Sequence, residues 1–590
     1  MQAVIKKLEK IPTVGIVFFY ILLGFILYAG SLFSAFMADD LEQIVRNPLV
    51  QTLSNIPKDF LATSTFNTGG GLSHGLYYKP VLLLFFTIFY NLGGNGSWFL
   101  HVVQVAIHIA NAIFVFILLK KFFPKLGALL GSFLFLIHPV NIETVVYISN
   151  LQDVLFFFFG MLSLIIFLSK KSYMWQGVAQ VLLLCSLLSK ETGILFFAVI
   201  PLLLFFFASK KQTLQFFLGI IPTIILYAAL RFGVAGIPIV NKSNFPLTSV
   251  PLGMRLLYIP YLIQYYLKAF FWPSDLFVFQ LWGIKTLTFT TFYGPLLVDS
   301  IFVILAALIG VFLKYKKSPC TLAFVFFAIW FTLGMLLHLQ IVPLDATAAG
   351  RWFYFPEVGI IGMLLCFFAS VSVTKKGIKT AGLYVIAVIL LILFIRSFIR
   401  VSQWSSALVL FQRDWKVGYN TYTGDTKEFT YFSPMESLLA VELLNNGFIE
   451  EAKQHFLHAA MVSTDSYTKA VALNNLAVTY EKLGDYTNAQ KTYQEELHIS
   501  NFYIGYNNYA DFLTRHADVK EAQTFIVKSL QLFPDNAQLW YDLSVVENAL
   551  GNTTEAHNAL QKALALDSTI VSQNQSMQLP SNVPLYNKKQ

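Results

Sequence analysis

Charged residues are scarce in this 590-residue sequence: they make up 12% of it, whereas soluble domains carry about 25%. Hydrophobic residues make up 56% and aromatic residues 16%, and phenylalanine alone occurs 58 times. This composition excludes a chain that is surrounded by water along its whole length. It is typical of a protein with a large lipid-facing part.

Cysteine is also rare, and the three cysteines all lie in apolar segments, so no disulfide framework supports the polar region that begins at Gln412. No Cys/His spacing of a metal site occurs. No phosphate-binding P-loop, glycine-rich dinucleotide turn or kinase motif set occurs either, which argues against a nucleotide held by a Rossmann-type domain. The sequence therefore predicts no resident cofactor, and it offers no support for a divalent metal while leaving one open.

The net charge of +9 comes from lysines that stand mostly at the ends of apolar segments. Such lysines indicate membrane topology rather than a nucleic-acid surface, because cytoplasmic loops collect basic residues. The first apolar run, 14–36, is too long for a signal-peptide core and reads as an uncleaved span. The basic clusters are Lys6/Lys7/Lys10, Lys120/Lys121/Lys125, Lys170/Lys171, Lys210/Lys211, Lys314/Lys316/Lys317 and Lys375/Lys376/Lys379.

One arrangement places every basic cluster on the cytoplasmic side, and it has eleven spans of apolar sequence. The predicted spans are 14–36, 99–119, 126–138, 151–168, 174–188, 194–207, 214–230, 295–313, 322–337, 358–371 and 381–398. The apolar segments 80–90 and 256–272 are short or interrupted, and we expect them to lie at the outer membrane surface. The N-terminus is then cytoplasmic and the polar tail extracytoplasmic, in a multi-pass protein of the cell membrane. If only one of the two interfacial segments crossed, the tail would change sides.

The polar tail contains four similar segments, with alanines at 452, 489, 522 and 556. The alanines are separated by about 34 residues, and each is followed four residues later by an aromatic or aliphatic side chain, which is the signature of the tetratricopeptide repeat (TPR). We therefore expect an all-α protein with a polytopic membrane domain (1–411), a TPR solenoid (412–571) and a disordered tail (572–590). TPR solenoids usually bind peptide segments.

Several polar residues lie where the predicted spans meet the outer side. The pair Asp39-Asp40 follows the first span, and carboxylates at that depth are either functional or simple flanking caps. Arg351 is suited to holding a phosphate, or it anchors the aromatic segment around it at the interface. Lys190 and Glu191 either neutralise each other or contact a substrate. His101 and His108 lie inside a predicted span, and we interpret them as packed core residues. The candidate site residues are Asp39, Asp40, Lys79, His138, Glu143, Lys190, Glu191 and Arg351.

The order of these motifs resembles a known family. The matching stretches are Asp39-Asp40, Tyr78-Lys79-Pro80, Trp98-Phe99-Leu100-His101, Ile137 to Glu143, Ser189 to Gly193, Arg351 to Gly359 and Trp404 to Phe411. In this order, followed by TPRs, they resemble the transmembrane-and-TPR O-mannosyltransferases of the GT-C glycosyltransferase superfamily and their prokaryotic relatives. The resemblance implies an inverting enzyme that takes a sugar, typically mannose, from a polyprenyl phosphate.

The resemblance also implies that a carboxylate after the first span is the catalytic base. We assign Asp40 to that role, with Asp39 as its partner or as an alternate base, because the attacking hydroxyl must lose a proton. Arg351 and Lys79 then contact the phosphate, and His138, Glu143, Lys190 and Glu191 are further substrate contacts. The family has Arg-Pro where this chain has Lys79-Pro80, and Glu-Arg-Tyr where it has Gly350-Arg351-Trp352.

Membrane lipid, a polyprenyl-phosphate sugar and a protein acceptor bound through the TPRs are the expected partners. The main alternative is an oligosaccharide transferase of the O-antigen ligase type, which would be expected to centre on a long, basic late outer loop. A second alternative is a non-catalytic scaffold, although an anchor needs one span rather than eleven. Transport is disfavoured because charges inside the spans are scarce.

Overall fold

A computed structural model describes most of the chain between residues 12 and 574. The residues it leaves undescribed are 1–11, 62–76, 170–171, 238–246, 248–249, 279, 281, 285, 372–375, 423–428, 432–433, 464–465, 502, 568–569, 572–573 and 575–590. The described chain forms two compact units, which divide between Leu410 and Phe411 apart from two short exchanged segments. Each unit is described by itself.

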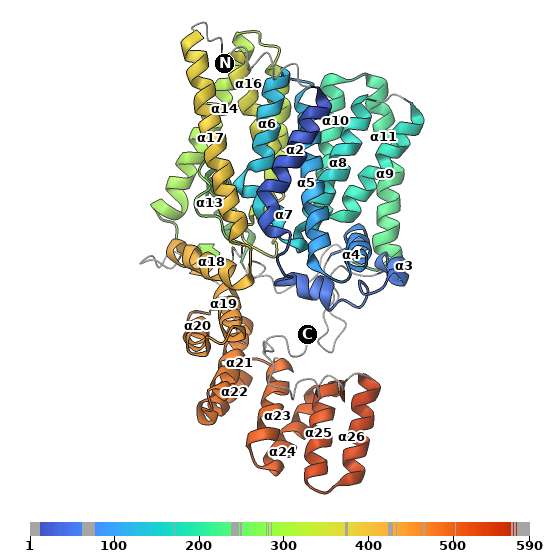
Figure 1. Ribbon diagram of the computed structural model, residues 1–590, viewed down its shortest axis with the longest axis vertical. Coiled ribbons are helices and arrows are strands. Elements are labelled where there is room, and N and C mark those ends of the chain that lie inside the picture. The colour runs from blue at the N-terminus through green and yellow to red at the C-terminus, as the bar shows by residue number, and fades with distance from the viewer. Residues whose placement is uncertain are drawn as a thin grey trace. The chain divides into compact units, whose positions relative to one another are not determined.

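The first unit is a bundle of helices (Figure 1). Its helices are α2 (Thr13–Tyr28), α3 (Ile56–Asp59), α4 (Pro80–Leu92), α5 (Ser97–Leu119), α6 (Lys125–Ile137), α7 (Ile142–Val146), α8 (Leu151–Ser169), α9 (Tyr173–Ser189), α10 (Leu195–Phe207), α11 (Lys210–Ala228), α12 (Leu252–Leu256), α13 (Ile259–Phe271), α14 (Gly294–Tyr315), α15 (Thr321–Leu336), α16 (Pro356–Ser370) and α17 (Lys376–Ser402). Short 3-10 or π turns are η1 (Ala29–Ser31), η2 (Leu41–Val45), η3 (Leu53–Asn55), η4 (Pro139–Asn141), η5 (Ile148–Asn150), η6 (Glu191–Ile194), η7 (Ala229–Val234), η8 (Phe289–Tyr293) and η9 (Gly350–Phe353). Two three-residue strands, β1 (Trp282–Ile284) and β2 (Phe429–Tyr431), and the helix α18 (Ala407–Tyr422) complete the elements that precede the repeats.

In the described part of the chain, six helices are long and apolar enough to cross a membrane. A seventh crossing results if α6 and the Pro139–Val146 segment, which meet at a bend of 44°, count as one span. The other four predicted spans coincide with shorter apolar helices, namely α9, Glu191–Phe207 (η6 with α10), α15 and α16. The expected all-helical membrane architecture is therefore confirmed, whereas the total of eleven spans stays a prediction.

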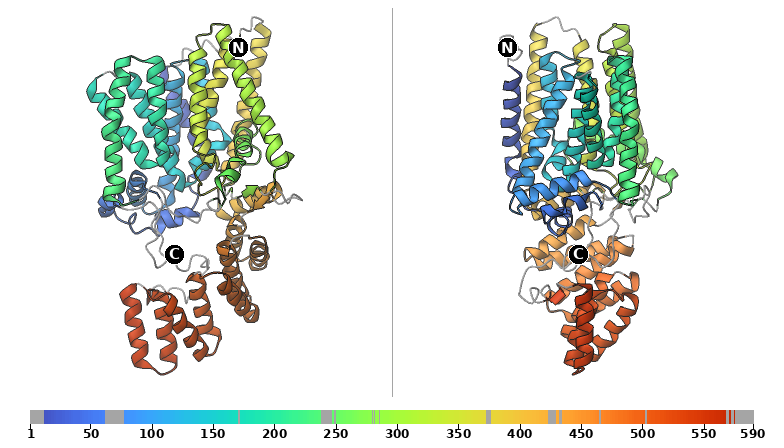
Figure 2. Two further views of the ribbon diagram at one scale, coloured as in Figure 1. Left: turned by 180° about the vertical axis from the view of Figure 1, so that it is seen from behind. Right: turned by 90° about the vertical axis from the view of Figure 1, so that its right-hand side faces the viewer.

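The predicted interfacial segments are both short helices. α4 and α13 have 13 residues each, which corresponds to about 20 Å at 1.5 Å per residue, less than the roughly 30 Å of a bilayer core. Figure 2 shows the end of the bundle where α4 lies across the axes of the long helices. The first span is shorter than predicted, because the helical backbone of α2 and η1 stops at Ser31 rather than at residue 36.

Consecutive long helices run in opposite directions, and this places the basic connectors at one end of the bundle (Figure 1). The connectors between α5 and α6, α10 and α11, and α14 and α15 lie at the end where α2 begins. The arrangement agrees with a single cytoplasmic face for these clusters, and the orientation in a membrane stays a prediction. The clusters at Lys6/Lys7/Lys10 and Lys170/Lys171, together with Lys375, lie outside the described residues.

Small residues allow the bundle to pack tightly. A side chain added at Gly359 in α16 would place its Cβ 2.6 Å from the backbone nitrogen of Phe331 in α15, and one at Gly362 would enter the ring of Phe327. Close helix approach at small residues is the usual solution in membranes, where apolar burial alone does not drive helices together. The α15–α16 pair thereby holds in place the segment between these helices, which carries Arg351.

The second unit begins within α18. After α18, its described residues form four helix pairs: α19 (Pro434–Asn445) and α20 (Ile449–Val462), α21 (Ser466–Lys482) and α22 (Tyr486–Ile499), α23 (Tyr503–His516) and α24 (Val519–Leu532), α25 (Ala537–Ala549) and α26 (Thr553–Leu566). The four predicted alanines are buried at the start of α20, α22, α24 and α26. Phe456, Tyr493 and Ile526, four residues further on, are buried as well. The predicted repeats are therefore confirmed, and nearly all of the predicted tail 572–590 lies outside the described residues.

Candidate active site

A sharp turn after the first helix presents the two adjacent carboxylates differently. Ala38 has a φ of +48°, a left-handed conformation that residues with a side chain rarely adopt. Asp40, directly after the turn, is buried with 1% of its surface exposed. Its Oδ1 accepts hydrogen bonds from the Ser149 N–H (2.8 Å) and hydroxyl (2.5 Å), and its Oδ2 accepts one from the Met37 N–H (3.2 Å).

Burial raises the pKa of Asp40 to about 7, although the donors from Ser149 and Met37 act in the opposite direction. Both carboxylate oxygens are thus occupied by groups of the protein itself, and the side chain is closed to solvent. This geometry suits a residue that ties the Asp39-Asp40 turn to the η5 turn. It does not suit one that reaches a substrate.

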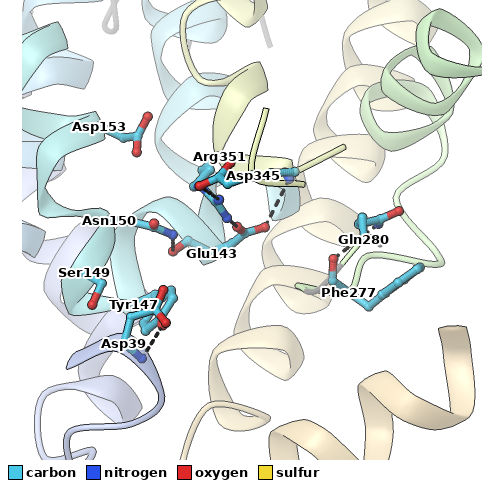
Figure 3. Close-up of polar contacts among 12 residues, drawn as sticks. Asp39, Glu143, Tyr147, Ser149, Asn150, Asp153, Phe277, Gln280, Asp345 and Arg351 are labelled. Atoms are coloured by element: carbon cyan, nitrogen blue, oxygen red, sulfur yellow. Dashed lines mark hydrogen bonds and ion pairs between the residues drawn. The ribbon is translucent and has the colours of Figure 1, made fainter. Parts of the chain in front are cut away.

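Asp39 is the more accessible of the pair, because its surface is exposed where that of Asp40 is buried. Its backbone N–H donates to the Tyr147 hydroxyl over 2.9 Å (Figure 3). Although Asp39 reaches the surface, the protein around its carboxyl desolvates that group and raises its pKa, and the charge of Arg351 and the Tyr147 hydroxyl oppose that rise. Asp39 therefore combines access with an elevated basicity, as a general base requires.

Glu143 holds the segment that carries the candidate phosphate ligand. Its Oε1 accepts from Arg351 Nη1 over 2.8 Å, and its Oε2 accepts from the Gly350 N–H over 3.1 Å. A Cβ on Gly350 would lie 2.8 Å from that Oε2, so glycine is the residue that leaves room for the carboxylate. Glu143 is thus a partner of Arg351 in the protein, where the sequence predicted a substrate contact.

Lys79 is a buried cation, with 7% of its surface exposed, and it has no close counterion among the described residues. Its Nζ lies over the Tyr77 ring, 4.0 Å from the ring centroid, and among the described residues no acidic oxygen lies within 4.0 Å of it. Desolvation lowers the pKa of Lys79 to about 8, while Glu191 raises it. A buried ammonium without a counterion is costly, and an anionic ligand would remove that cost.

Lys190 and Glu191 do not pair with each other, so that predicted alternative is wrong. Lys190 Nζ lies 2.6 Å from Asp153 Oδ1, and Arg231 Nη1 lies 3.0 Å from Glu191 Oε1. The backbone of this short segment is extended at Lys190 (φ −160°, ψ 140°), which directs neighbouring side chains apart. Glu191 also accepts the Tyr78 N–H over 3.4 Å, next to Lys79.

The three histidines singled out in the sequence, His101, His108 and His138, are buried and bonded within the protein. His138 Nδ1 accepts the Val140 N–H over 3.2 Å, and its Nε2 bonds the Phe270 carbonyl over 3.0 Å. Both ring nitrogens of His138 are therefore occupied inside the protein, which leaves none for the substrate contact that the sequence predicted. His101 and His108 are buried and hydrogen-bonded to the carbonyls of Ser34 and Leu136, as expected of core residues.

The structure adds four residues to the site that the sequence did not single out: Tyr147, Ser149, Asp153 and Asp345. Figure 3 shows Asp39, Tyr147, Glu143, Arg351 and Asp345 within one region of the bundle. Apart from Asp345 and Arg351, which are six residues apart, the contacts of this site join residues between 37 and 208 positions apart in the sequence. No local spacing identifies such pairs. Within the described residues, no group of three or more His, Cys, Asp or Glu side chains is arranged to hold a metal ion.

The comparisons with known proteins point in one direction. The chain is 24% identical over 402 residues to a protein O-mannosyl-transferase of Caenorhabditis elegans, and the alignment covers 66% of this chain and 56% of that protein. It is 22% identical over 629 residues to the protein O-mannosyl-transferase TMTC3 of Homo sapiens, with 90% and 65% covered. The chain resembles protein O-mannosyl-transferases.

This similarity confirms the resemblance inferred from the motifs. A shorter match, 30% identical over 186 residues, relates 29% of the chain to 20% of a protein O-mannosyl-transferase of Drosophila melanogaster. A family model for the tetratricopeptide repeat matches residues 470–495, which cover most of α21 and most of α22. The chain spans about three fifths of the length of the first two relatives.

Proposed function

We propose that this chain is a membrane glycosyltransferase that moves a sugar, mannose in the first instance, from a polyprenyl phosphate to a hydroxyl of a protein. The observation that carries the proposal is the cluster at one end of the apolar bundle, where the accessible carboxylate Asp39 shares a site with the cations Arg351 and Lys79. Similarity to relatives named protein O-mannosyl-transferases supports the same reaction class.

Asp39 is the proposed catalytic base. An acceptor hydroxyl loses its proton as its oxygen attacks the anomeric carbon, and a carboxylate within hydrogen-bond reach accepts that proton. Because Asp40 is closed by three internal hydrogen bonds, the roles first assigned to the pair are exchanged: Asp39 takes the proton and Asp40 positions the turn. Direct attack opposite the leaving phosphate inverts the anomeric configuration.

Arg351 and Lys79 are the proposed ligands of the leaving phosphate. Charge that develops on the departing oxygen is stabilised by fixed cations in a site that excludes water. Arg351 is held by Glu143 through one of its terminal nitrogens, Nη1, while Nη2 has its nearest acidic oxygen 4.0 Å away. Nη2 and the Lys79 ammonium are therefore the groups that an incoming phosphate would meet.

The site is proposed to face the extracytoplasmic side. The basic connectors lie at the opposite end of the bundle from Asp39, and such connectors favour the cytoplasm. With an odd number of spans the TPR unit follows on the same side as the site. We assign to the repeats the binding of the polypeptide acceptor or of a partner that delivers it.

Transfer of radiolabelled mannose from polyprenyl phosphate to serine- and threonine-containing peptides tests the proposal. We expect label on the peptide with the intact chain and none with the Asp39→Asn/Asp40→Asn double variant. A chain truncated after Phe411 is expected to lose transfer to long peptides while keeping transfer to a minimal hydroxyl acceptor. Failure of the intact chain with every polyprenyl-phosphate sugar would contradict the proposal and favour a scaffold.

The pH profile of transfer should have two limbs. Activity requires Asp39 ionised, so the acid limb is expected above the ordinary range for aspartate because burial raises that pKa. Activity also requires Lys79 charged, so the alkaline limb is expected near pH 8, where the ammonium loses its proton. Lys79→Arg should move the alkaline limb upward and leave the acid limb unchanged, because arginine stays charged beyond pH 12. An alkaline limb that does not move would remove Lys79 from the phosphate site.

A further inference from the structure

One buried glutamine closes the loop between α15 and η9. The Gln340 side chain donates from Nε2 to the carbonyls of Ala346 (2.7 Å) and Thr347 (2.9 Å), and its Oε1 accepts from the Leu344 N–H (3.1 Å). Gln340 is fully buried and has a φ of +58°. A left-handed backbone at a residue other than glycine persists only where the surroundings enforce it, and such positions gather at functional sites.

Both ends of this closed loop are bonded to other segments of the first unit. At its start, Arg255 Nη1 donates to the carbonyls of Gln340 (2.9 Å) and Ile341 (3.1 Å). At its end, the Thr347 hydroxyl donates to the Trp282 carbonyl (2.6 Å) and accepts the Trp282 N–H (3.2 Å). The backbone that carries Asp345 is therefore held from both sides, as it must be if a side chain on it is to meet a ligand in a defined place.

Asp345 is the polar side chain that the closed loop presents. Its carboxylate is 43% exposed, and its nearest cation is Arg351 Nη2 at 4.0 Å, which is too long for a hydrogen bond. Among the described residues no hydrogen-bond donor to this carboxylate is found. Arg351 already has a close carboxylate partner in Glu143 at 2.8 Å. Neutralising Arg351 is therefore not a sufficient reason for the protein to hold Asp345 in this position.

Asp345 lies in the same site as the proposed catalytic groups. It is beside Arg351 in Figure 3, and its charge acts on both Asp39 and Lys79. A carboxylate repels the phosphate that Arg351 and Lys79 would bind, so its ligand must be something other than that phosphate. A carboxylate only accepts hydrogen bonds, and the donors that a sugar transfer brings to this place are hydroxyl groups.

We propose that Asp345 is a specificity residue that accepts a hydrogen bond from a hydroxyl of the donor sugar. This inference rests on the proposed function. The sugar ring is then held between the phosphate at Arg351 and the carboxylate of Asp345, with its anomeric carbon open to an acceptor activated by Asp39. The closed loop fixes Asp345 so that donors with the hydroxyl in the right place are preferred.

Donors that each lack one hydroxyl of mannose test this assignment. For the wild type, removal of the hydroxyl that Asp345 binds should lower kcat/KM about 10- to 100-fold, as expected for a hydrogen bond to a charged group. Asp345→Asn should remove the part of this factor that comes from the charge, because the asparagine oxygen accepts only a weaker, neutral hydrogen bond. The same deoxy donor should then cost clearly less than it costs the wild type. Such non-additivity marks a direct contact, which a merely structural role would not produce.

Asp275→Asn is the matched control, because that carboxylate is also 43% exposed and pairs with Lys268 at 2.5 Å. We expect it to behave as the wild type with every donor. Gln340→Ala, which opens the loop, should weaken the discrimination among deoxy donors while leaving transfer measurable. The hydroxyl bound by Asp345 could belong to the donor sugar or to the acceptor, and a shortened acceptor that keeps only the attacking hydroxyl distinguishes the two. With this acceptor we expect Asp345→Asn to lower kcat/KM by the same factor as with the full acceptor.

Three results would overturn the inference. Additive losses for Asp345→Asn and every deoxy donor would show that no donor hydroxyl contacts this carboxylate. If Asp345→Asn lowered kcat/KM with the full acceptor but not with the shortened one, Asp345 would contact a hydroxyl of the acceptor and not one of the donor sugar. Absence of transfer by the wild type from any polyprenyl-phosphate sugar would overturn the proposed function and this inference with it, whereas the first two results leave the proposed function standing.

Discussion

Replacement of Asp39 by asparagine is expected to lower transfer by about 10³-fold while the protein stays folded, because a positioned base typically contributes 10²- to 10⁴-fold. Asp39 is exposed, and the hydrogen bond to Tyr147 is donated by the Asp39 backbone, which the substitution keeps. The loss should fall on kcat rather than on KM for the donor. Initial rates with purified protein in detergent, together with the thermal unfolding midpoint, provide the measurement.

Asp40→Asn is the control for that experiment, since it changes the neighbouring carboxylate in the same way. An asparagine amide can accept from Ser149 only by turning its NH₂ group toward the Met37 N–H, which leaves two donors facing each other. We expect a destabilisation of roughly 1–3 kcal/mol and less than a tenfold change in kcat of the folded protein. A large loss of kcat in Asp40→Asn with wild-type activity in Asp39→Asn would restore the first assignment of the base.

The adjacent aspartates illustrate what the sequence can predict here. Their position after a long apolar run was enough to place them at the end of the bundle. Their different roles depend on the left-handed turn at Ala38 and on Ser149, 109 residues further along the chain. No local pattern announces a non-glycine residue in that conformation, so the choice between the two carboxylates required the folded chain.

The large elements were predictable because their signals are local and repeated. Apolar runs separated by basic clusters predicted each of the apolar helices, and the 34-residue period predicted the four helix pairs. The number of membrane crossings could not be predicted in the same way. Helices such as α9 and α15 have 17 and 16 residues, and at that length composition alone does not distinguish a membrane span from a buried helix.

Charge pairs were the least predictable feature. Lys190 and Glu191 are neighbours in sequence, yet each finds a partner on another element: Asp153 on α8 and Arg231 on η7. Asp345 carries no motif, and its significance comes from Gln340, which closes the loop around it. A site assembled from several helices and loops is therefore visible in the sequence only where a recognisable motif falls on it.

Arg351→Met is expected to act on both folding and transfer, because it removes the partner of a buried carboxylate. Glu143 has a side-chain exposure of 7%, and an uncompensated charge at such a place costs about 3 kcal/mol or more. The same variant lacks the proposed phosphate ligand, so donor binding and kcat should fall together by at least about 10²-fold, as when a preorganised charge-stabilising group is lost. Unfolding midpoints and transfer rates of the purified protein measure the two effects.

The double variant Glu143→Gln/Arg351→Met separates these two contributions. A neutral glutamine needs no counterion, and its side-chain oxygen can still accept the Gly350 N–H that Glu143 Oε2 accepts over 3.1 Å. The unfolding midpoint should therefore return toward that of the wild type, since replacing both members of a buried pair costs far less than breaking it. Transfer should not return, because the cation at the leaving phosphate is still missing. Recovery of both stability and transfer would mean that Arg351 serves only to neutralise Glu143, and the phosphate would then have to be held by Lys79 and Lys190, the remaining cations of the site.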